Sequence, residues 1–262
     1  MAKIITFGIS KGGCSKTTSS AITAYLLSQN EKVLAIDMDG QGNLTSILTG
    51  EYDICNVFEE RTVLEAILEG KAEPYIVNVY RNLDLLPSND FLATLSRKMY
   101  ENNLKLNALE IALESVMNHY DWIIIDTPPA LSEQTLMPLS TRSPEGSFAV
   151  IMFDGSMLTY YAIPKFMEII EETRERFNSN LQTLGILFNL IDAKAKENEA
   201  MQKVIDQDYP DLRFNSIIRR RATTRRLAIN GLNQENKELH NALELYIPFV
   251  KEMKERVQRN NK

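Results

Sequence analysis

Residues 10–18 read Ser-Lys-Gly-Gly-Cys-Ser-Lys-Thr-Thr, and this stretch decides the fold. An apolar run at residues 4–9 precedes it, and apolar residues at helical spacing follow it. This order predicts a buried strand, a tight loop and a helix, where backbone N–H groups and the positive end of the helix dipole converge on an anion. The sequence therefore predicts a phosphate-binding loop.

Individual residues of the loop suit a nucleotide. Gly12 and Gly13 let the backbone turn sharply and approach phosphate oxygens without a Cβ in the way. We expect Lys16 to bind the β- and γ-phosphates and the Thr17 hydroxyl to hold Mg²⁺. The motif taken alone leaves an alternative, a Gly/Ser/Lys turn that binds no ligand.

The loop departs from the strict pattern G-x-x-x-x-G-K-[ST] at two positions. This chain has Ser10 and Ser15 where the pattern has glycine. A serine fits there only if its dihedral angles suit an L-residue, so we expect a slightly altered or mildly strained loop.

Carboxylates end two further apolar runs. Residues 32–37 end at Asp37, with Asp39 two positions on, and residues 122–126 end at Asp126. Ligands of α/β sheets bind at the carboxyl ends of parallel strands. Asp126 also matches a Walker B acid, which binds Mg²⁺ through water. An acidic turn after a strand is common by itself, but the order of the three motifs favours one nucleotide site.

The three motifs together resemble those of ParA/MinD-type ATPases. The deviant Walker A motif of that family, K-G-G-x-x-K-[ST]-T, matches residues 11–18. Its D-x-D-P-Q-G-N segment resembles residues 37–43, with Gly40 in place of proline, and its D-x-P-P segment matches residues 126–129. The resemblance covers most of the chain, residues 3–230, and is strongest to the short ParA partition ATPases.

The resemblance implies a role for each site residue. Lys11 takes the place of the signature lysine, which reaches the partner's phosphates in a nucleotide-sandwich dimer. Asp37 helps to hold Mg²⁺ through water, and Asp39 positions or activates the attacking water. Asn189 lies near the place where relatives contact adenine, although it could equally cap its strand. The expected catalytic residues are Lys11, Lys16 and Asp39, and the expected metal-binding residues are Thr17, Asp37 and Asp126. The expected nucleotide-binding residues are Lys11, Gly12, Gly13, Cys14, Ser15, Lys16, Thr17, Thr18 and Asn189.

A basic segment at residues 219–226 contrasts with an acidic chain of net charge −6. Hydroxyls of Thr223 and Thr224 lie between the arginines and suit phosphate oxygens. ParA proteins carry an I-P-R segment here, followed by residues that bind DNA without sequence preference, and Ile218 replaces that proline. The alternative is that these arginines pair with Asp or Glu residues on a solvated face of the protein. The expected DNA-binding residues are Arg219, Arg220, Arg221, Arg225 and Arg226.

Composition excludes several other classes of protein. No apolar run approaches the ~20 residues that cross a bilayer, and no leader precedes the first strand, so we expect a cytoplasmic, nucleoid-associated protein. Cys14 and Cys55 give neither a disulfide framework nor metal-ligand spacing. They also do not lie where a metallocluster reductase of this superfamily needs cysteine. Neither His119 nor His240 has an evident catalytic partner.

Alternating apolar runs and helical patterns predict an α/β fold, a doubly wound, mostly parallel sheet flanked by helices. We expect one ATPase domain over residues 1–262, with helices at 104–119, 164–177 and about 234–259. MinD-like proteins end in a membrane-targeting helix. Here acidic and basic residues alternate in the last helix, which favours packing against the sheet and no stable membrane association.

The resemblance implies a slow, partner-stimulated ATPase that uses ATP and Mg²⁺ to segregate DNA. The ATP-bound homodimer would bind non-specific DNA through the arginines and release it on hydrolysis stimulated by a ParB-like centromere-binding protein. A MinD-like positioning ATPase on a membrane and a non-hydrolysing DNA scaffold remain alternatives. The sequence does not predict how Ser10, Ser15, Gly40 and Ile218 alter the rates.

Overall fold

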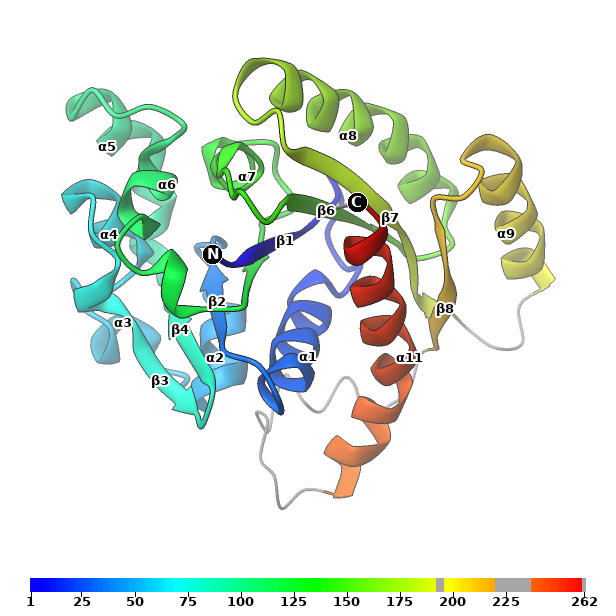
Figure 1. Ribbon diagram of the computed structural model, residues 1–262, viewed down its shortest axis with the longest axis horizontal. Helices are drawn as coiled ribbons and strands as arrows, with labels where there is room; N and C mark the ends of the chain where they lie inside the picture. Colours follow the sequence, from blue (N-terminus) through cyan, green and yellow to red (C-terminus); the bar gives the residue numbers. More distant parts are fainter. Residues whose placement is uncertain (192–195, 220–236, 261–262) are drawn as a thin grey trace.

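The computed structural model describes residues 1–191, 196–219 and 237–260. Within them, an eight-stranded sheet has the order β3-β4-β2-β5-β1-β6-β7-β8 (Figure 1). Neighbouring strands are parallel except β3 and β4, which are antiparallel. The strands are β1 (Lys3–Gly8), β2 (Val33–Asp37), β3 (Val77–Tyr80), β4 (Leu83–Leu86), β5 (Trp122–Asp126), β6 (Ser147–Phe153), β7 (Leu181–Ile191) and β8 (Arg213–Arg219). The predicted doubly wound, mostly parallel sheet is confirmed.

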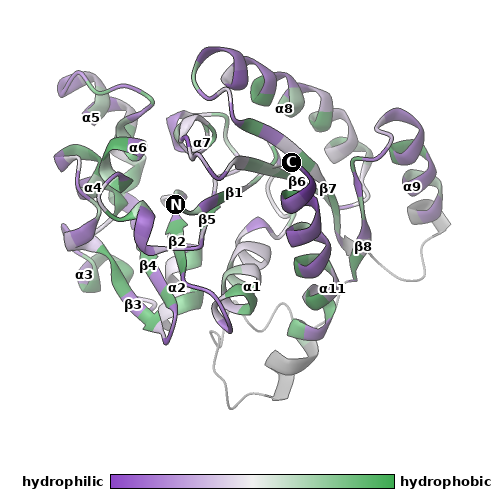
Figure 2. Cartoon of the chain, in the orientation of Figure 1, coloured by the Kyte–Doolittle hydropathy of each residue, from purple (hydrophilic) through white to green (hydrophobic). Residues whose placement is uncertain are grey.

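Side chains of the central strands are buried on both sides of the sheet. In β1, Ile5 and Phe7 join one hydrophobic cluster, with α1 (Lys16–Ser28) and α11 (Lys237–Asn260), whereas Ile4 joins a second. The second cluster includes α4 (Val63–Glu69), α5 (Leu95–Glu101) and α6 (Ala108–Leu113). Figure 2 shows hydrophobic strands inside the molecule and hydrophilic residues on the outer turns of α8 and α9. The remaining helices are α2 (Asn43–Thr49), α3 (Ile54–Val57), α7 (Glu133–Ser140), α8 (Met157–Arg176) and α9 (Lys196–Asp208).

The predicted single helix at 104–119 is wrong. The structure has α6 at Ala108–Leu113 and a separate 3-10 turn at Met117–His119. The Ala112 carbonyl accepts a hydrogen bond from the amide of Ala72 at 2.8 Å, and the amide of Val116 donates to the Leu113 carbonyl at 3.0 Å instead of to Ala112. A contact from a distant part of the chain therefore ends the helix early.

The start of the helix predicted at 164–177 is also wrong. α8 begins at Met157, where the Ser156 hydroxyl caps it by accepting a hydrogen bond from the Thr159 amide at 3.3 Å. Pro164 therefore lies inside the helix instead of in its first turn. The antiparallel strand β3 and the helix α7 were not predicted.

Helix α11 packs along α1 and β8, as predicted for the last helix (Figure 1). Its apolar face is completely buried at Tyr246, Phe249, Met253 and Val257. No helix in the described part of the chain has the length and hydrophobicity that a membrane span requires.

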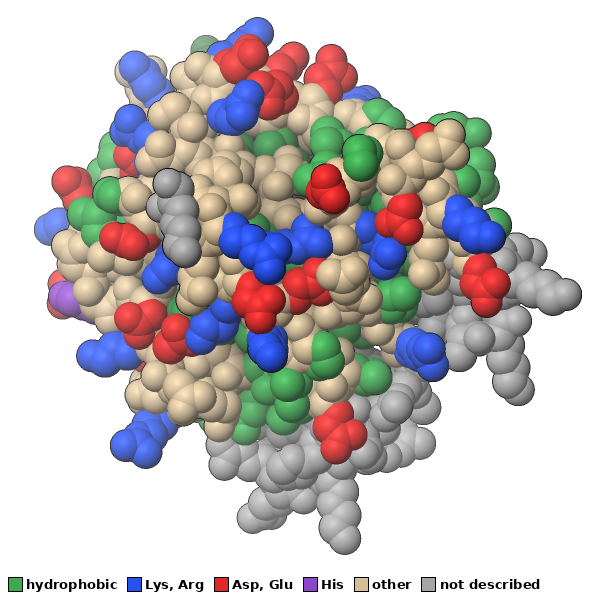
Figure 3. Space-filling model, turned by 45° about the vertical axis from the view of Figure 1, so that its right-hand side comes forward, with side chains coloured by type: hydrophobic (Ala, Val, Ile, Leu, Met, Phe, Trp, Pro, Cys, Tyr) green, Lys and Arg blue, Asp and Glu red, His purple; other side chains and the backbone are tan. Residues whose placement is uncertain are grey.

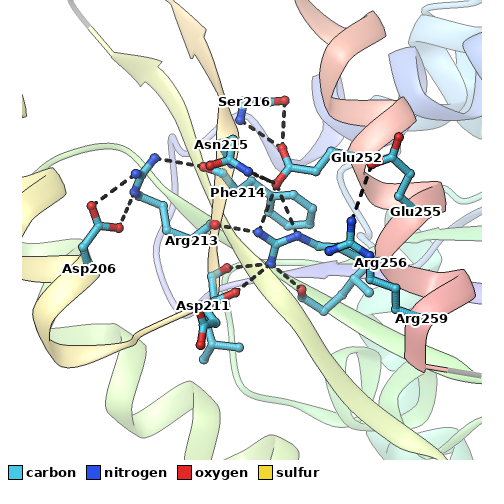
Figure 4. A network of polar contacts seen from close by, with 12 residues as sticks. Asp206, Asp211, Arg213, Phe214, Asn215, Ser216, Glu252, Glu255, Arg256 and Arg259 are labelled. Atoms are coloured by element: carbon cyan, nitrogen blue, oxygen red, sulfur yellow. Dashed lines mark hydrogen bonds and ion pairs between the residues drawn. The ribbon is translucent and has the colours of Figure 1, made fainter. Parts of the chain in front are cut away.

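An arginine joins α11 to the amino-terminal ends of β7 and β8 (Figure 4). Arg256 donates hydrogen bonds to the carbonyls of Leu184, Asp211, Leu212 and Arg213, and its guanidinium lies 4.3 Å from the centre of the Phe214 ring. Residues Glu252, Glu255 and Arg259 surround it, and Figure 3 shows basic and acidic side chains intermingled on this face. Because backbone carbonyls and the Glu252 carboxylate, 3.0 Å from the guanidinium, satisfy its donors, this cluster fixes the last helix in place.

Candidate functional site

The phosphate-binding loop connects β1 to α1, as predicted. Ser15 is the N-cap of α1 and has φ 52° and ψ 38°, the left-handed conformation that glycine adopts without strain. Gly13 also has a positive φ, 83°. The expected strain at Ser15 is therefore confirmed. Ser10 does not have a positive φ, so it carries no left-handed strain of the kind found at Ser15.

A cleft of about 560 Å³ opens in front of this loop. Residues 12–18 line one side, and the remaining lining comes from Asp39, Gln41, Asn43, Ser46, Ile47, Tyr52 and Pro129. The structure thus brings Asp39 of the second motif to the predicted nucleotide-binding loop. The Asp39 carboxylate accepts a hydrogen bond from the Gln41 amide at 3.0 Å, which orients it at the edge of the cleft.

Lys16 is folded into the loop. Its ammonium donates to the Lys11 carbonyl at 3.0 Å and lies 3.5 Å from the Ile9 carbonyl, and the residue is only 6% exposed. Burial lowers the pKa of Lys16, although the carboxylate of Asp126 opposes this shift. A cation held by neutral carbonyls beside an open cleft is suited to exchange those carbonyls for phosphate oxygens.

Asp37 and Asp126 are paired in register on the adjacent strands β2 and β5. Both residues are completely buried. Burial raises the pKa of Asp37 to about 7, and burial together with the nearby charge of Asp37 raises the pKa of Asp126 to about 8. Two carboxylates so placed are stable as anions only beside compensating positive charge.

Hydroxyl groups hold both carboxylates. Thr45, in α2, donates to Asp37 from its amide and its hydroxyl, each at 2.9 Å. Ser20, in α1, donates to Asp126 Oδ1 at 3.0 Å, whereas Asp126 Oδ2 is buried without a hydrogen-bond partner in the described part of the chain. The unsatisfied oxygen, the second carboxylate and the nearby Thr17 hydroxyl form an all-oxygen donor set, which fits Mg²⁺.

The sequence did not reveal the residues that hold Lys11. Its ammonium lies 2.9 Å from Asp154 Oδ2 and donates to the Ser156 hydroxyl at 2.7 Å. Burial raises the pKa of Asp154, but hydrogen bonds from Lys11, Thr159 and Ser156 outweigh it and hold that pKa well below its usual range. Asp154 directly follows β6, so the strand-end rule that selected Asp126 could also have selected it.

Asn189 is completely buried behind the loop. Its amide donates to the Ser19 hydroxyl at 2.7 Å, and Ser19 is 3.1 Å from the hydroxyl of Tyr246 in α11. Asn189 thus ties β7 to α1 and α11, and it has no exposed surface for a base. Its contact with adenine stays a prediction.

Arg219 is exposed at the end of β8. The other expected DNA-binding residues, Arg220, Arg221, Arg225 and Arg226, lie outside the described residues. The arginine patch therefore stays a prediction.

Comparisons with known proteins agree with these motifs. A family model described as an AAA domain matches residues 2–183. The chromosome-partitioning ATPase Soj of Treponema pallidum is 29% identical over 242 residues, which span 88% of this chain and 88% of Soj.

Two solved structures share the fold. A plasmid partition protein from Borrelia burgdorferi bound to AMPPNP has a TM-score of 0.74 and 25% identity, over 96% of this chain and 99% of that chain. Cobyrinic acid a,c-diamide synthase from Mycobacterium smegmatis, with a bound ATP analog and magnesium, has a TM-score of 0.71 and 25% identity over 88% and 91%. These two proteins differ in chemistry, so the fold by itself does not select the reaction.

Proposed function

The chain belongs to the ParA/MinD-type AAA-domain family, and from this membership we propose that it is a DNA-partition ATPase that uses ATP and Mg²⁺. The observation that carries the proposal is the convergence of Lys16, Asp37 and Asp126 at one edge of the sheet, in front of the loop that bears Lys11. The similarity to the chromosome-partitioning ATPase Soj supports a biological role in DNA partition.

Each residue of the site has a proposed role in binding or hydrolysis. The backbone of residues 12–18 and the Lys16 ammonium bind the phosphates. Thr17, Asp37 and Asp126 hold Mg²⁺, directly or through water, and the ion supplies positive charge at the phosphates. Asp39, at the edge of the cleft, orients the attacking water.

Lys11 makes hydrolysis depend on a second copy of the chain. In the single chain its ammonium is paired with Asp154, so this lysine does not reach its own cleft. We propose that the triphosphate of a partner subunit competes with Asp154 for Lys11 when two copies meet. Because the phosphates carry more charge than one carboxylate, the exchange favours the ATP-bound dimer.

The remaining features complete a segregation cycle. The ATP-bound dimer joins two arginine patches at residues 219–226 into one DNA-binding surface, and a ParB-like protein stimulates the hydrolysis that dissolves it. The protein then works in the cytoplasm on the nucleoid. The buried apolar face of α11 supports this cycle over a MinD-like membrane cycle.

Phosphate release with ATP, Mg²⁺ and DNA tests the proposal. We expect slow turnover by the wild type and loss of at least about 100-fold for Lys11→Ala and Asp39→Ala, which remove transition-state contacts. The exposed Lys71→Ala serves as a matched control and should retain wild-type turnover. Turnover that is equal in all four proteins would refute the assigned roles and favour a non-hydrolysing scaffold.

A further inference from the structure

The buried hydroxyl of Ser20 lies one turn beyond Lys16 in α1 and contacts the end of β5. Ser20 is completely buried, and its Oγ lies 3.0 Å from Oδ1 of Asp126 and 3.0 Å from the carbonyl of Lys16. A serine hydroxyl has a single proton, so these two oxygens compete for it. Because a hydrogen bond to an ionised group is stronger than one to a neutral carbonyl, the proton goes to Asp126 when that carboxylate is charged.

The backbone of Asp126 is fixed independently of its side chain. β5 lies between β1 and β2, and Asp126 is paired in register with Phe7 on one side and Asp37 on the other. Its carbonyl also accepts a hydrogen bond from the Met38 amide at 2.9 Å. The sheet therefore sets where the side chain begins, whereas rotation about its two side-chain bonds still decides where the carboxylate oxygens point.

Ser20 engages one carboxylate oxygen of Asp126 and leaves the other free. Oδ2 is buried and has no hydrogen-bond partner among the residues that the structure describes. The hydroxyl of Thr17, the expected Mg²⁺ ligand, is close to the same carboxylate. A buried oxygen without a partner costs free energy unless a donor or a cation satisfies it. With Oδ1 held by Ser20, Oδ2 has one fixed direction in which to meet such a group.

We propose that Ser20 is a positioning residue for Mg²⁺, because it holds Asp126 so that Oδ2 is presented to the ion or to a water molecule bound to it. The inference rests on the proposed function, in which Asp126 helps to hold Mg²⁺ in the nucleotide site. Ser20 acts only through Asp126. Loss of a group that orients a metal-binding side chain typically weakens metal binding by roughly 10- to 100-fold.

A purely structural role for Ser20 is the alternative, and the same helix offers a control for it. Serine hydroxyls within helices often bond only to a carbonyl of the preceding turn. Ser28 does this, since it is 4% exposed and its hydroxyl donates to the Tyr25 carbonyl at 2.8 Å. Ser28→Ala therefore removes a buried hydroxyl from α1 without affecting Asp126. An effect of Ser20→Ala that Ser28→Ala does not share belongs to the contact with the carboxylate.

Binding of ADP to the full chain, measured by calorimetry in Mg²⁺ and in EDTA, tests the inference. ADP lacks the γ-phosphate that Lys11 of a second copy is proposed to engage, so the measurement concerns a single copy. The dissociation constant in EDTA divided by that in Mg²⁺ gives the metal enhancement. Ser20→Ala should lower this enhancement about tenfold and leave the affinity in EDTA within about twofold of the wild type. Ser20→Thr, which keeps the hydroxyl, and Ser28→Ala should keep the wild-type enhancement.

Two further variants keep the test decisive if Ser20→Ala alone prevents folding. Ser20→Cys replaces the hydroxyl by a thiol, which is a weak donor, and should also lower the metal enhancement. In an Asp126→Asn background no carboxylate remains to be held, so adding Ser20→Ala should not change the enhancement further.

The outcomes separate the inference from the function on which it rests. A wild type that binds ADP equally well in Mg²⁺ and in EDTA overturns both the inference and the proposed metal site. An enhancement that falls in Asp126→Asn but not in Ser20→Ala or Ser20→Cys overturns the inference alone. Equal losses in Ser20→Ala and Ser28→Ala, or a further loss from Ser20→Ala in the Asp126→Asn background, also overturn it.

Discussion

At the scale of single residues, Ser15 stores strain in the phosphate-binding loop. Its φ of 52° places a side chain in the left-handed region, which disfavours L-residues by about 1–2 kcal/mol. The strain persists because the loop must turn at this point to begin α1.

Ser15→Gly should raise the free energy of unfolding by about 0.5–1 kcal/mol, because relief of the left-handed strain exceeds the added flexibility of the unfolded chain. Urea unfolding of the nucleotide-free protein measures the change. Ser15→Ala, which keeps a Cβ in the strained conformation, is the control and should not stabilise the protein. If alanine stabilises as much as glycine, the backbone explanation is wrong.

The buried pair Asp37 and Asp126 predicts a pH-dependent stability. The folded-state pKa is about 7 for Asp37 and about 8 for Asp126, whereas the ordinary value in an unfolded chain is near 4. Between about pH 4 and pH 8 the folded protein therefore binds more protons than the unfolded chain. The free energy of unfolding of the metal-free protein should therefore fall as the pH rises from 5 to 8, by up to about 1.4 kcal/mol per pH unit for each group.

Urea unfolding in EDTA at successive pH values measures this fall. Asp126→Asn cannot ionise and should reduce the slope, whereas Glu59→Gln, at an exposed position, should retain the wild-type slope. Stability that is constant or rises between pH 5 and 8 would contradict the shifted pKa values.

At the scale of elements, the Arg256 cluster joins α11 to the sheet (Figure 4). Its guanidinium reaches four carbonyls from β7, β8 and the turn before β8. Gly185 permits this approach, because a Cβ there would lie 2.4 Å from the Leu212 carbonyl and 2.8 Å from the Arg256 guanidinium. The helix also reaches the phosphate-binding loop helix through Tyr246 and Ser19. The position of the last helix is therefore fixed at both the sheet and α1.

Arg256→Lys should lower the free energy of unfolding by about 2 kcal/mol or more, because a lysine ammonium cannot reproduce the planar fork that satisfies several carbonyls. Guanidinium unfolding monitored by circular dichroism measures the loss. Arg259→Lys is a matched control three residues on, where the side chain is 77% exposed and should tolerate the change. Equal effects of both variants would show that the cluster contributes no specific stability.

At the scale of the whole molecule, DNA binding should depend on the nucleotide. The chain has a net charge of −6, so a single copy has little general attraction to DNA, and the proposed binding depends on two patches joined in a dimer. We expect binding with AMPPNP and Mg²⁺ that falls steeply with salt and is lost in Arg219→Ala or Arg220→Ala.

Fluorescence anisotropy with labelled duplexes of two unrelated sequences measures this binding over a series of salt concentrations. Arg97→Ala, an exposed arginine on α5, is the control and should bind as the wild type does. Equal binding by the nucleotide-free protein would contradict the proposed switch.

The sequence by itself determined the fold class, a mostly parallel sheet flanked by helices, and the three nucleotide motifs. Apolar runs that end in acidic residues, and a glycine-rich loop before a helix, are local patterns whose physical cause lies within a few neighbouring residues. For this reason the strand ends at Asp37 and Asp126 and the strain at Ser15 could be predicted.

The tertiary structure alone decided which distant residues meet. The pairing of Lys11 with Asp154 spans 143 positions, and the Ala72 amide that ends α6 comes from another segment. The burial of Asn189 behind the loop likewise depends on α1 and α11. Such contacts follow from how the elements pack, because hydrogen bonds between distant residues leave no periodic trace in the sequence.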